Sequence, residues 1–312
     1  MEIIEDVSLS RYKDLSLALG FFDGIHKGHR EVILNAVNLA KENRIKSAVI
    51  TFKENPKSII KDIKPCYILS LKNRIEFIRE LKVDYLFLLD FNKELAKVKK
   101  EEYLKKYLIE RYNPKFITIG FNHYFGEGRE GNIDYLRQEE KKFKYRAMEI
   151  MPILDETGLA ISSSRIKRLI EVGNIERANN LLGYKFFIEN KVVRGNQIGR
   201  QIGFRTANIE YPEGIVRIPK GVYAVKVRID GFEKEYEGVM NFGVKPTFDN
   251  NLELPIAEVN IFDFNEDIYD KQIRIEICSY IRKEMKFLNV EVLKEQIVKD
   301  VEQVRDYFVK NN

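Results

Sequence analysis

Two of the chain's three histidines, His26 and His29, stand three residues apart in the glycine-bracketed segment 20–29, GFFDGIHKGH. That spacing lets both imidazoles face one ligand where a strand turns into a helix, and the free N–H groups at a helix start favour an anion there. Imidazoles so placed suit a phosphate that gains charge in a transition state. The alternative is a turn whose histidines only cap a helix, and the glycine-bracketed pair favours the phosphate site. We predict that this site includes His26 and His29 together with Gly20, Phe22, Asp23, Gly24 and Gly28.

The run His26-Lys27-Gly28-His29 resembles the His-x-Gly-His motif of the nucleotidyltransferase superfamily. Members of that superfamily transfer a nucleotidyl group from a nucleoside triphosphate and release pyrophosphate. Segment 162–166, SSSRI, resembles the superfamily's second motif, a Ser/Thr-rich helix start followed by arginine. Hydroxyl and N–H groups of Ser162 and Ser163 can hold the β- and γ-phosphates, with Arg165 as a cationic clamp.

A second glycine-rich segment, 199–208, reads GRQIGFRTAN. Backbone N–H groups of such a segment can cradle phosphate, and we assign Gly199, Arg200 and Gly203 to that role. Thr206 and Asn208 are two residues apart, so in extended chain their side chains face the same way. Their oxygens suit Mg²⁺ beside phosphates. A hairpin whose Thr and Asn cap a turn fits the residues alone equally well.

Segment 199–208 also resembles the riboflavin kinase signature Gly-Arg-x-x-Gly-Phe-Pro-Thr-Ala-Asn. Further segments resemble that family in the same order, namely 238–248 (GVMNFGVKPTF), 257–261 (AEVNI) and 282–287 (RKEMKF). The resemblance implies that Glu258 is the catalytic base and that the flavin is bound by Asn241, Arg282 and Glu284. With the amino-terminal motifs, nearly the whole chain resembles the bacterial bifunctional riboflavin kinase/FMN adenylyltransferase family.

This resemblance implies two consecutive reactions. Riboflavin and ATP, with Mg²⁺, would give FMN in the second half of the chain. FMN and a second ATP would then give FAD and pyrophosphate in the first half. His26 and His29 would contact the transferring and leaving phosphates, and Arg165 would grip the pyrophosphate. Asn122 and His123 are weaker candidates for the FMN end, and His123 fits the role of an ordinary loop residue equally well.

Four positions depart from the family pattern: Arg205 stands where Pro is usual, Asn55 where His is usual, Asn122 where Asp is common and Asp270 where Gly is common. None removes a proposed catalytic group, but they bear on flavin affinity and on the relative rates of the two activities. They also motivate a competing hypothesis, a kinase-only enzyme with a degenerate first domain, which the His26/His29 pair opposes.

Two competing hypotheses come from different functional classes. A nucleotidyltransferase for another phosphorylated substrate leaves Thr206, Asn208 and Glu258 unexplained. A non-enzymatic basic binding protein predicts clustered Arg and Lys with exposed aromatic residues, whereas acidic and basic residues are mixed along this chain. Segment 126–131, GEGREG, fits the dinucleotide pattern G-x-G-x-x-G, but it does not follow the first strand of a βαβ unit, so we predict a loop.

The elements that must position these residues change in kind near residue 183. Before it, short apolar runs alternate with helical periodicity, which predicts a doubly wound α/β domain with a parallel sheet. The expected strands cover 15–22, 47–52, 85–91, 116–120 and 146–154. The expected helices cover 30–43, 71–81 and about 101–112, and a last helical stretch starts after the capping serines 162–164 and ends near 183.

After residue 183, strands with short turns predict a small antiparallel β-barrel. The expected strands cover 186–194, 222–229, 236–243, 256–264 and 273–281. The chain then ends in a long helix, because one apolar stripe runs through Leu293, Ile297, Val301, Val304 and Phe308. We therefore predict a nucleotidyltransferase-like FMN adenylyltransferase domain over 1–183 and a riboflavin kinase barrel domain over 184–312.

Composition excludes several further classes. A chain of 312 residues with 44% hydrophobic residues is long enough for two folded domains, and two cysteines exclude a disulfide scaffold. The net charge of +5 fits anionic substrates and does not require nucleic acid. There is no run of about 18 apolar residues for a membrane span and no signal-peptide pattern at the start, so we expect a cytoplasmic protein. The oligomeric state is not indicated.

Overall fold

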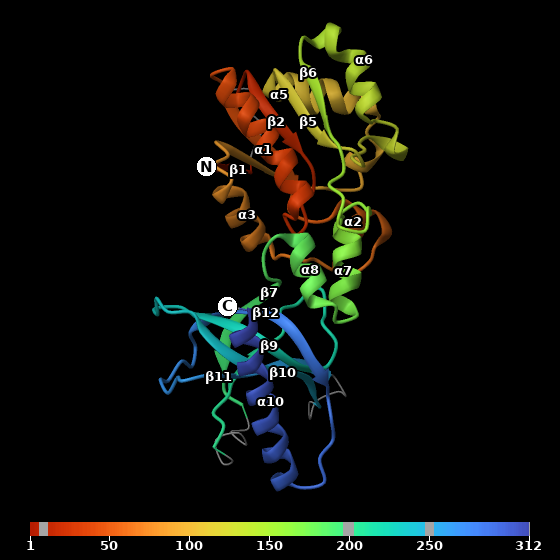
Figure 1. Ribbon diagram of the computed structural model, residues 1–312. Coiled ribbons are helices and arrows are strands. Elements are labelled where there is room, and N and C mark those ends of the chain that lie inside the picture. The colour runs from red at the N-terminus through yellow and green to blue at the C-terminus, as the bar shows by residue number, and fades with distance from the viewer. Residues whose placement is uncertain (6–11, 196–202, 247–252, 312) are drawn as a thin grey trace. The chain divides into compact units, whose positions relative to one another are not determined.

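The computed structural model describes residues 1–5, 12–195, 203–246 and 253–311 of the chain (Figure 1). The chain divides into two compact units, Met1–Ser163 and Ser164–Asn312. Each unit has its own sheet.

The first unit contains a six-stranded sheet in which all neighbouring strands run parallel. The strand order is β1 (Glu2–Ile4), β4 (Tyr85–Leu89), β3 (Lys46–Phe52), β2 (Leu15–Leu19), β5 (Phe116–Gly120) and β6 (Arg146–Ile150). The central strands are buried along most of their length, as expected for strands covered on both faces. This arrangement confirms the predicted doubly wound α/β domain.

The longer helical segments of this unit bury apolar side chains. Helix α1 (Lys27–Glu42) buries Val32, Ile33, Ala36, Val37 and Ala40, the residues whose spacing predicted it. Leu104, Leu108 and Leu136 belong to the buried cluster that also contains strand residues of the sheet. The remaining helical segments of the unit are α2 (Pro56–Lys61), α3 (Leu71–Glu80), η1 (Leu95–Lys97), α4 (Lys100–Glu102), the π-helix η2 (Tyr103–Ile109), α5 (Glu110–Tyr112), η3 (Glu127–Arg129) and α6 (Ile133–Phe143).

The predicted element bounds need correction in several places. The strand expected over 15–22 ends at Leu19. The sequence stays apolar through Phe22, but Phe22 has a φ of 56°, which is incompatible with a strand. The strand expected over 146–154 ends at Ile150. Strand β1 and helices α2 and α6 were not predicted. Segment 126–131, predicted to be a loop, contains the single 3₁₀ turn η3, with left-handed φ angles at Gly126 and Gly128.

The second unit begins at Ser164, the second residue of helix α7 (Ser163–Glu171), and continues into α8 (Ile175–Leu182). One helical stretch was predicted where these two helices lie. Gly173, with a φ of 79°, separates them. The units divide after Ser163, ahead of the predicted domain boundary at 183. The contacts of α8 account for the difference, since Asn179 Nδ2 donates to the carbonyl of Ile277 at 2.9 Å and Asn179 Oδ1 accepts from the N–H of Phe186 at 2.7 Å.

The rest of the second unit is a closed antiparallel barrel, as the sequence predicted. Its strand order is β10 (Tyr236–Pro246), β11 (Glu253–Ile261), β8 (Ala207–Glu210), β7 (Phe187–Val193), β12 (Gln272–Lys283) and β9 (Gly221–Ile229), with β9 pairing back to β10. Five strands were predicted here, and the sixth is β8, formed by the end of the glycine-rich segment 199–208. Closure leaves none of these strands as a free sheet edge.

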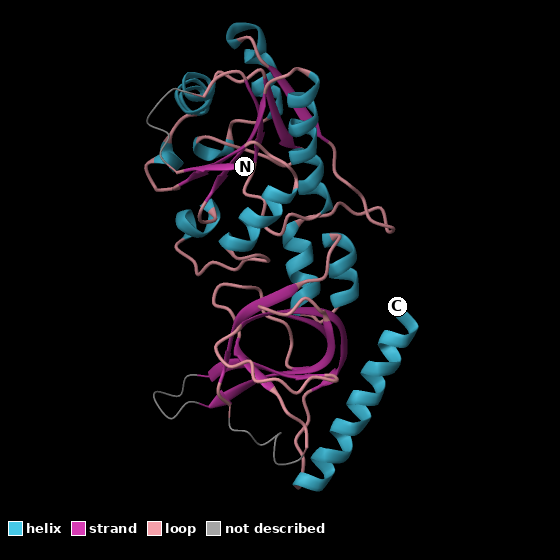
Figure 2. Cartoon of the chain, turned by 90° about the vertical axis from the view of Figure 1, so that its left-hand side faces the viewer, coloured by secondary structure: helices cyan, strands magenta, loops and turns pink. Residues whose placement is uncertain are grey.

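Side chains alternate between the inside and the outside of the barrel wall. Tyr223 and Val225 fill the interior and are fully buried. Val222 and Val239 face outward and pack against Val304 and Phe308 of the last helix, α10 (Val290–Asn311). Helix α10 runs along the outside of the barrel (Figure 2). Val304 and Phe308 confirm the carboxyl-terminal part of the predicted apolar stripe.

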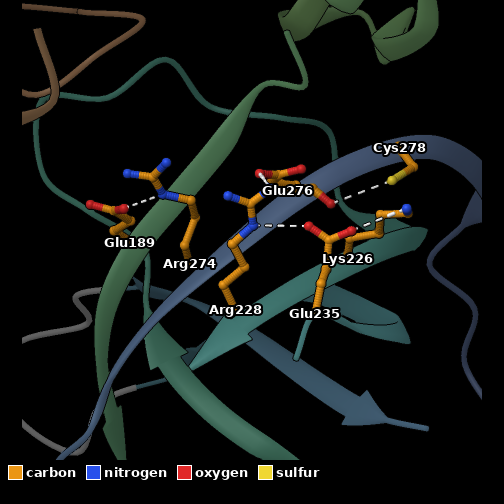
Figure 3. A network of polar contacts seen from close by, with 7 residues as sticks. All are labelled: Glu189, Lys226, Arg228, Glu235, Arg274, Glu276 and Cys278. Atoms are coloured by element: carbon orange, nitrogen blue, oxygen red, sulfur yellow. Dashed lines mark hydrogen bonds and ion pairs between the residues drawn. The ribbon is translucent and has the colours of Figure 1, made fainter. Parts of the chain in front are cut away.

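Another part of the outer wall carries a network of ion pairs (Figure 3). Glu235 accepts from Lys226 Nζ at 3.1 Å and from Arg228 Nε at 2.9 Å, and Arg228 Nη2 lies 3.6 Å from Glu276 Oε1. Burial alone would raise the pKa of Glu235, but these two cations hold it below its ordinary value. The outer wall therefore has an apolar part beneath α10 and a charged part.

The two cysteines differ in their surroundings. Cys66 is exposed, whereas Cys278 is buried in the cluster beneath α10. Burial raises the pKa of the Cys278 thiol to about 11, which keeps that thiol protonated and unreactive. Among the described residues, no helix combines the length and apolar character needed to cross a membrane.

Candidate active sites

The first candidate site lies at the carboxyl end of β2. From this central strand the chain proceeds to β3 on one side and only later to β5 on the other, and β2 pairs with both. Leu19 is level with Ile119, so Gly20 and Gly120 leave neighbouring strands at the same edge. In open α/β sheets, ligands bind in the crevice at such a switch in strand order. The fold thus places the predicted turn 20–29 where a ligand is expected.

The turn itself has an unusual backbone. Phe22, Gly24 and Ile25 have φ angles of 56°, 86° and 36°, a region that costs non-glycine residues energy and is common at functional sites. The Asp23 carboxylate fixes the turn by accepting from the N–H of Ile68 at 2.8 Å. A Cβ on Gly24 would lie 2.8 Å from the Ile68 side chain. Phe22, Asp23 and Gly24 therefore have a structural role in the turn, and their contact with a phosphate stays a prediction.

The serine motif reaches this turn from far along the chain. Ser163 Oγ donates to the backbone carbonyl of Asp23 at 2.9 Å, across a separation of 140 residues. The structure thereby brings together two of the segments that the sequence singled out. Ser162 is partly buried beside Ser163. Arg165 belongs to the second unit, and its role at the first site stays a prediction.

His26 and His29 form one compact pair at the start of α1. His26 is the N-cap residue, and its Nδ1 accepts from the backbone N–H of His29 at 3.3 Å. The two rings stack, with centroids 3.6 Å apart and planes at 22°. Because Nδ1 of His26 is an acceptor, a neutral His26 carries its proton on Nε2. The pair thus caps the helix and still offers an N–H donor.

Burial controls the protonation of both imidazoles. His26 is 4% exposed, and desolvation lowers its pKa to about 4. Desolvation, followed by the charges of His26 and Arg74, lowers the pKa of His29 well below its ordinary value. Both rings are neutral at pH 7, so they can act there as hydrogen-bond donors rather than as cations. His29 Nδ1 is buried and has no hydrogen-bond partner among the described residues, which suits a site completed by a ligand.

Arg74 is a residue of this region that the sequence reasoning missed. It is 3% exposed and donates to the carbonyls of Phe21 at 2.9 Å, Phe52 at 2.6 Å and Lys53 at 3.0 Å. Its guanidinium also lies 4.3 Å from the centroid of the Phe21 ring. Burial lowers the pKa of Arg74 to about 10, which leaves it charged at pH 7. It ties the turn to the end of β3, and a lone arginine in an amphipathic helix gave no signal of that role.

Asn122 and His123 follow β5 at the same edge of the sheet. Asn122 is exposed, and His123 is partly buried. The backbone N–H of His123 donates to the carbonyl of Gly120 at 2.9 Å. Burial lowers the pKa of His123 to about 4, and its Nε2 has no partner among the described residues. Asn55, which departs from the family pattern, caps α2 by accepting from the N–H of Lys57 at 2.9 Å. Its substitution for histidine thus has a local structural role.

The second candidate site is a row of residues across the barrel wall. Asn208 on β8 is level with Glu258 on β11, and Glu258 is level with Asn241 on β10. Asn241 is level with Val222 on β9, which is level with Arg282 on β12. Directly opposed residues of neighbouring strands share one face. Four of the predicted residues, from strands far apart in sequence, therefore lie at one level around the closed barrel. Asn208, Glu258 and Asn241 are on three adjacent strands, whereas Val222, which packs against α10, separates Asn241 from Arg282.

This row faces outward. Val239, two residues before Asn241 on the same strand, packs in the cluster with α10, whereas Met240 between them is fully buried. Alternation along a strand therefore puts Asn241 on the outer side with Val239. The predicted site consequently lies on the wall of the barrel and not in its packed interior.

A pocket of about 200 Å³ adjoins one end of the row. Thr206 and Asn208 both line it, together with Gly195, and Asn208 Nδ2 donates to the carbonyl of Thr206 at 3.4 Å. A Cβ on Gly195 would lie 2.6 Å from the Asn208 side chain, so a larger residue at position 195 would clash with Asn208. Glu258 is outside the lining of the pocket but is directly opposite Asn208.

The remaining predicted residues of the glycine-rich segment fall into two groups. Gly199 and Arg200 lie outside the described residues. Gly203 has a φ of 89°, and a Cβ there would meet no atom of the described residues within 4 Å, as suits a backbone that a ligand approaches closely. Arg205, which replaces the usual proline, donates from Nη1 to the carbonyl of Asn265 at 3.2 Å.

Arg282 is the last residue of the row, and Glu284 lies beside β10. Glu284 Oε1 would be 2.9 Å from a Cβ on Gly243, which lies two residues beyond Asn241 on the same strand. Arg282 is half-buried and forms an ion pair with Asp300 of α10. Glu284 therefore lies close to the row, whereas Arg282 is already engaged by the last helix.

The fold and its two sets of polar residues define a two-domain enzyme of phosphate-group transfer. Residues 9–165 match the family model described as FAD synthetase, and residues 182–308 match the model described as riboflavin kinase. The chain belongs to the bifunctional riboflavin kinase/FMN adenylyltransferase family, as its motifs indicated.

Curated relatives with that name match along nearly the full length. The Bacillus subtilis protein is 36% identical, over 94% of this chain and 92% of its own length. The Escherichia coli K12 protein is 29% identical, over 98% and 96%. Among solved structures, a Streptococcus pneumoniae chain named a macrolide-efflux protein is similar at 33% identity, with a TM-score of 0.87 over 97% of this chain and 98% of that one.

Proposed function

We propose that this chain makes FAD from riboflavin in two ATP-dependent steps, a kinase step in the barrel unit and an adenylyl transfer in the α/β unit. One observation carries the proposal: each unit matches one of the two enzyme families and also holds a group of the predicted polar residues. Riboflavin, ATP, FMN and FAD would be its ligands.

In the kinase step, the ribityl 5′-hydroxyl of riboflavin attacks the γ-phosphorus of ATP. A new P–O bond forms, the bond to the β-phosphate oxygen breaks, and ADP leaves. Glu258 accepts the hydroxyl proton, and general-base help of this kind contributes about 10²–10⁴-fold in rate. Its position supports this role, because Glu258 lies between Asn208 on one neighbouring strand and Asn241 on the other.

Thr206 and Asn208 would hold Mg²⁺ beside the ATP phosphates. They fit this ion because both line one pocket and offer hydroxyl and amide oxygens, and Mg²⁺ is commonly held jointly by few protein oxygens and substrate phosphates. Bound there, Mg²⁺ neutralises phosphate charge. Asn241, Arg282 and Glu284 would bind the flavin.

In the adenylyl-transfer step, a phosphate oxygen of FMN attacks the α-phosphorus of a second ATP. The bond to the β-phosphate oxygen breaks and pyrophosphate leaves. The attacking phosphate is already charged, so no general base is needed, and the step depends on orientation and on charge stabilisation. Neutral His26 donates from Nε2–H to the phosphates, with His29 beside it. Arg165 would grip the pyrophosphate, and Asn122 and His123 would contact FMN.

The direct test is incubation of the purified protein with riboflavin and MgATP, followed by separation of riboflavin, FMN and FAD. We expect FMN to form first and FAD to follow. FMN without FAD would support the kinase-only hypothesis, and formation of neither would contradict the proposal. A parallel reaction with EDTA tests the magnesium requirement, since both steps should then slow.

We also propose that the protein works in the cytoplasm, because both steps consume ATP. Cell fractionation followed by immunoblotting would test this location. The efflux activity in the name of the Streptococcus pneumoniae relative is not assigned to this chain, since both halves match families of flavin-nucleotide synthesis.

A further inference from the structure

Arg74 of α3 holds the turn 20–29 of the first site through backbone carbonyls. Its Nη1 donates to the carbonyl of Phe21 at 2.9 Å, and its Nη2 donates to the carbonyl of Phe52 at 2.6 Å. Thr51 Oγ1 donates to the same Phe21 carbonyl at 3.0 Å. The start of the turn is therefore fixed from two directions, by the end of β3 and by α3.

This hold acts where the turn is strained. Phe22, Gly24 and Ile25, which follow Phe21, have φ angles of 56°, 86° and 36°. Such conformations persist only where the surrounding contacts enforce them. His26 comes directly after Ile25, so the placement of the histidine pair depends on those contacts.

The hold by itself does not explain why a charged residue is buried at this place. Arg74 is 3% exposed and has no carboxylate oxygen within 4 Å among the described residues, with Asp23 acting on it only at longer range. Its Nε is buried and has no hydrogen-bond partner among them. A buried charge is costly unless it is compensated. An anionic ligand in the turn would supply that compensation.

We infer that Arg74 is a positioning residue of the adenylyl-transfer site, which fixes the His26/His29 turn and supplies a permanent positive charge beside it. The inference rests on the proposed function, in which this turn receives ATP and FMN. Both imidazoles are neutral at pH 7, whereas the two ligands are anions. In an interior of low dielectric, a charge stabilises anions beyond contact distance, and a charge that is already in place needs no reorganisation during the reaction.

The nearness of this charge can be measured at His29. Desolvation lowers the pKa of His29, and so do the charges of His26 and Arg74, which are the titratable or charged groups that act on it among the described residues. His26 stacks on His29 from the same helix start, and Arg74 belongs to α3. Removal of the arginine charge should therefore let His29 bind a proton at higher pH.

The test compares Arg74→Gln with Arg79→Gln, a matched change on the exposed side of the same helix. We expect Arg74→Gln to lower kcat/KM for FAD formation from supplied FMN by about 10- to 100-fold. FMN formation in the barrel unit should stay within about twofold of the wild-type rate, and Arg79→Gln should leave both activities unchanged. Wild-type FAD formation in Arg74→Gln would overturn the inference.

An NMR titration of the imidazoles distinguishes a charge from a purely structural hold. The chain has three histidines, so each can be assigned by replacing it with Gln. In Arg74→Gln, His29 should titrate at higher pH than in wild type. His123 should titrate as before, because burial alone lowers its pKa. An unmoved His29 titration would overturn the inference, and native chemical shifts of His26 and His123 show that the unit is folded.

A conservative variant covers the case in which Arg74→Gln does not fold. Arg74→Lys keeps the charge but loses the planar fork that a hold on three carbonyls needs. We expect FAD formation within about threefold of wild type and an unchanged His29 titration. A loss of more than tenfold in Arg74→Lys would count against a role of the charge.

Failure of the proposed function can be told apart from failure of the inference. Wild-type protein that forms FMN but no FAD would contradict the function proposed for the first site. The His29 titration in Arg74→Gln and Arg74→Lys would then still decide whether Arg74 supplies its charge to the turn.

Discussion

The two sites are assembled in different ways. In the first, one turn of seven residues and the start of one helix supply the histidine pair, and distant segments only brace it. In the second, each residue of the row comes from a different strand, and register alone brings them together. A site built locally depends on the conformation of its turn, whereas a site built by register depends on closure of the barrel.

The difference extends to charge. The histidines of the first site, His26 buried and His29 partly buried, are neutral at pH 7. The row in the barrel contains the ionisable Glu258 and Arg282 on its outer wall. The first site therefore offers shaped hydrogen-bond donors for groups that are already charged, and the second offers a base for a hydroxyl that must lose its proton.

The sharpest test of this contrast is Glu258→Gln. The change removes the proposed base and keeps the shape, so flavokinase kcat should fall by about 10²–10⁴-fold. FAD formation from supplied FMN should stay at the wild-type rate, because it does not use the barrel row. Wild-type flavokinase turnover in this variant would show that the base is misassigned.

The reciprocal change is the double variant His26→Ala/His29→Ala. Loss of preorganised donors to the phosphates should slow FAD formation from FMN by about 10²–10³-fold or more. FMN formation from riboflavin should persist, and chromatography of the products measures both. Parallel loss of both activities would argue against separate sites.

Acidification should affect the first unit through His26. Its pKa is lowered from 6.5 to about 4 in the folded state, so between these values the unfolded chain binds more protons. Stability should therefore fall as the pH drops from about 6.5 towards 4, by up to about 3 kcal/mol from this group. Thermal unfolding of wild type and His26→Gln across that range measures the effect. An equal pH dependence in both proteins would contradict it.

The smallest effects should come from two glycine substitutions with the same backbone strain. Gly24 and Gly203 have φ angles of 86° and 89°. Gly203→Ala brings its Cβ within 4 Å of no described residue, so it should cost about 1 kcal/mol from backbone strain. Gly24→Ala also crowds Ile68, so a loss of about 1–3 kcal/mol is expected. Urea unfolding measures both changes, and FAD formation from supplied FMN should fall only in Gly24→Ala.

Much of the architecture could be predicted because its signals are local. The strand over 116–120 is a continuous apolar run, and its predicted bounds match β5. The turn 20–29 contains both His26 and His29, so the histidine pair could be recognised from adjacent residues. Strand β8 has only four residues, and its pairing with β7 and β11 decides its conformation, so the glycine-rich segment alone left it open.

Residues that act through distant partners could not be predicted. Arg74 looks like one more cation on an amphipathic helix until three backbone carbonyls from elsewhere surround it. Asp300 likewise fits the polar side of α10 in sequence, and only the fold places it against Arg282. The row of the second site was located through family resemblance, because strand register is not visible in residue spacing.

The unequal surroundings of the two thiols have a practical consequence. A thiol-directed dye should attach at the exposed Cys66 and leave the buried Cys278 unlabelled. Cys66 is two residues before Ile68, whose N–H holds Asp23 in the phosphate turn. The unmodified chain thus carries a natural attachment point for a fluorophore beside its first site, and emission from that dye can report nucleotide arrival without engineered cysteines.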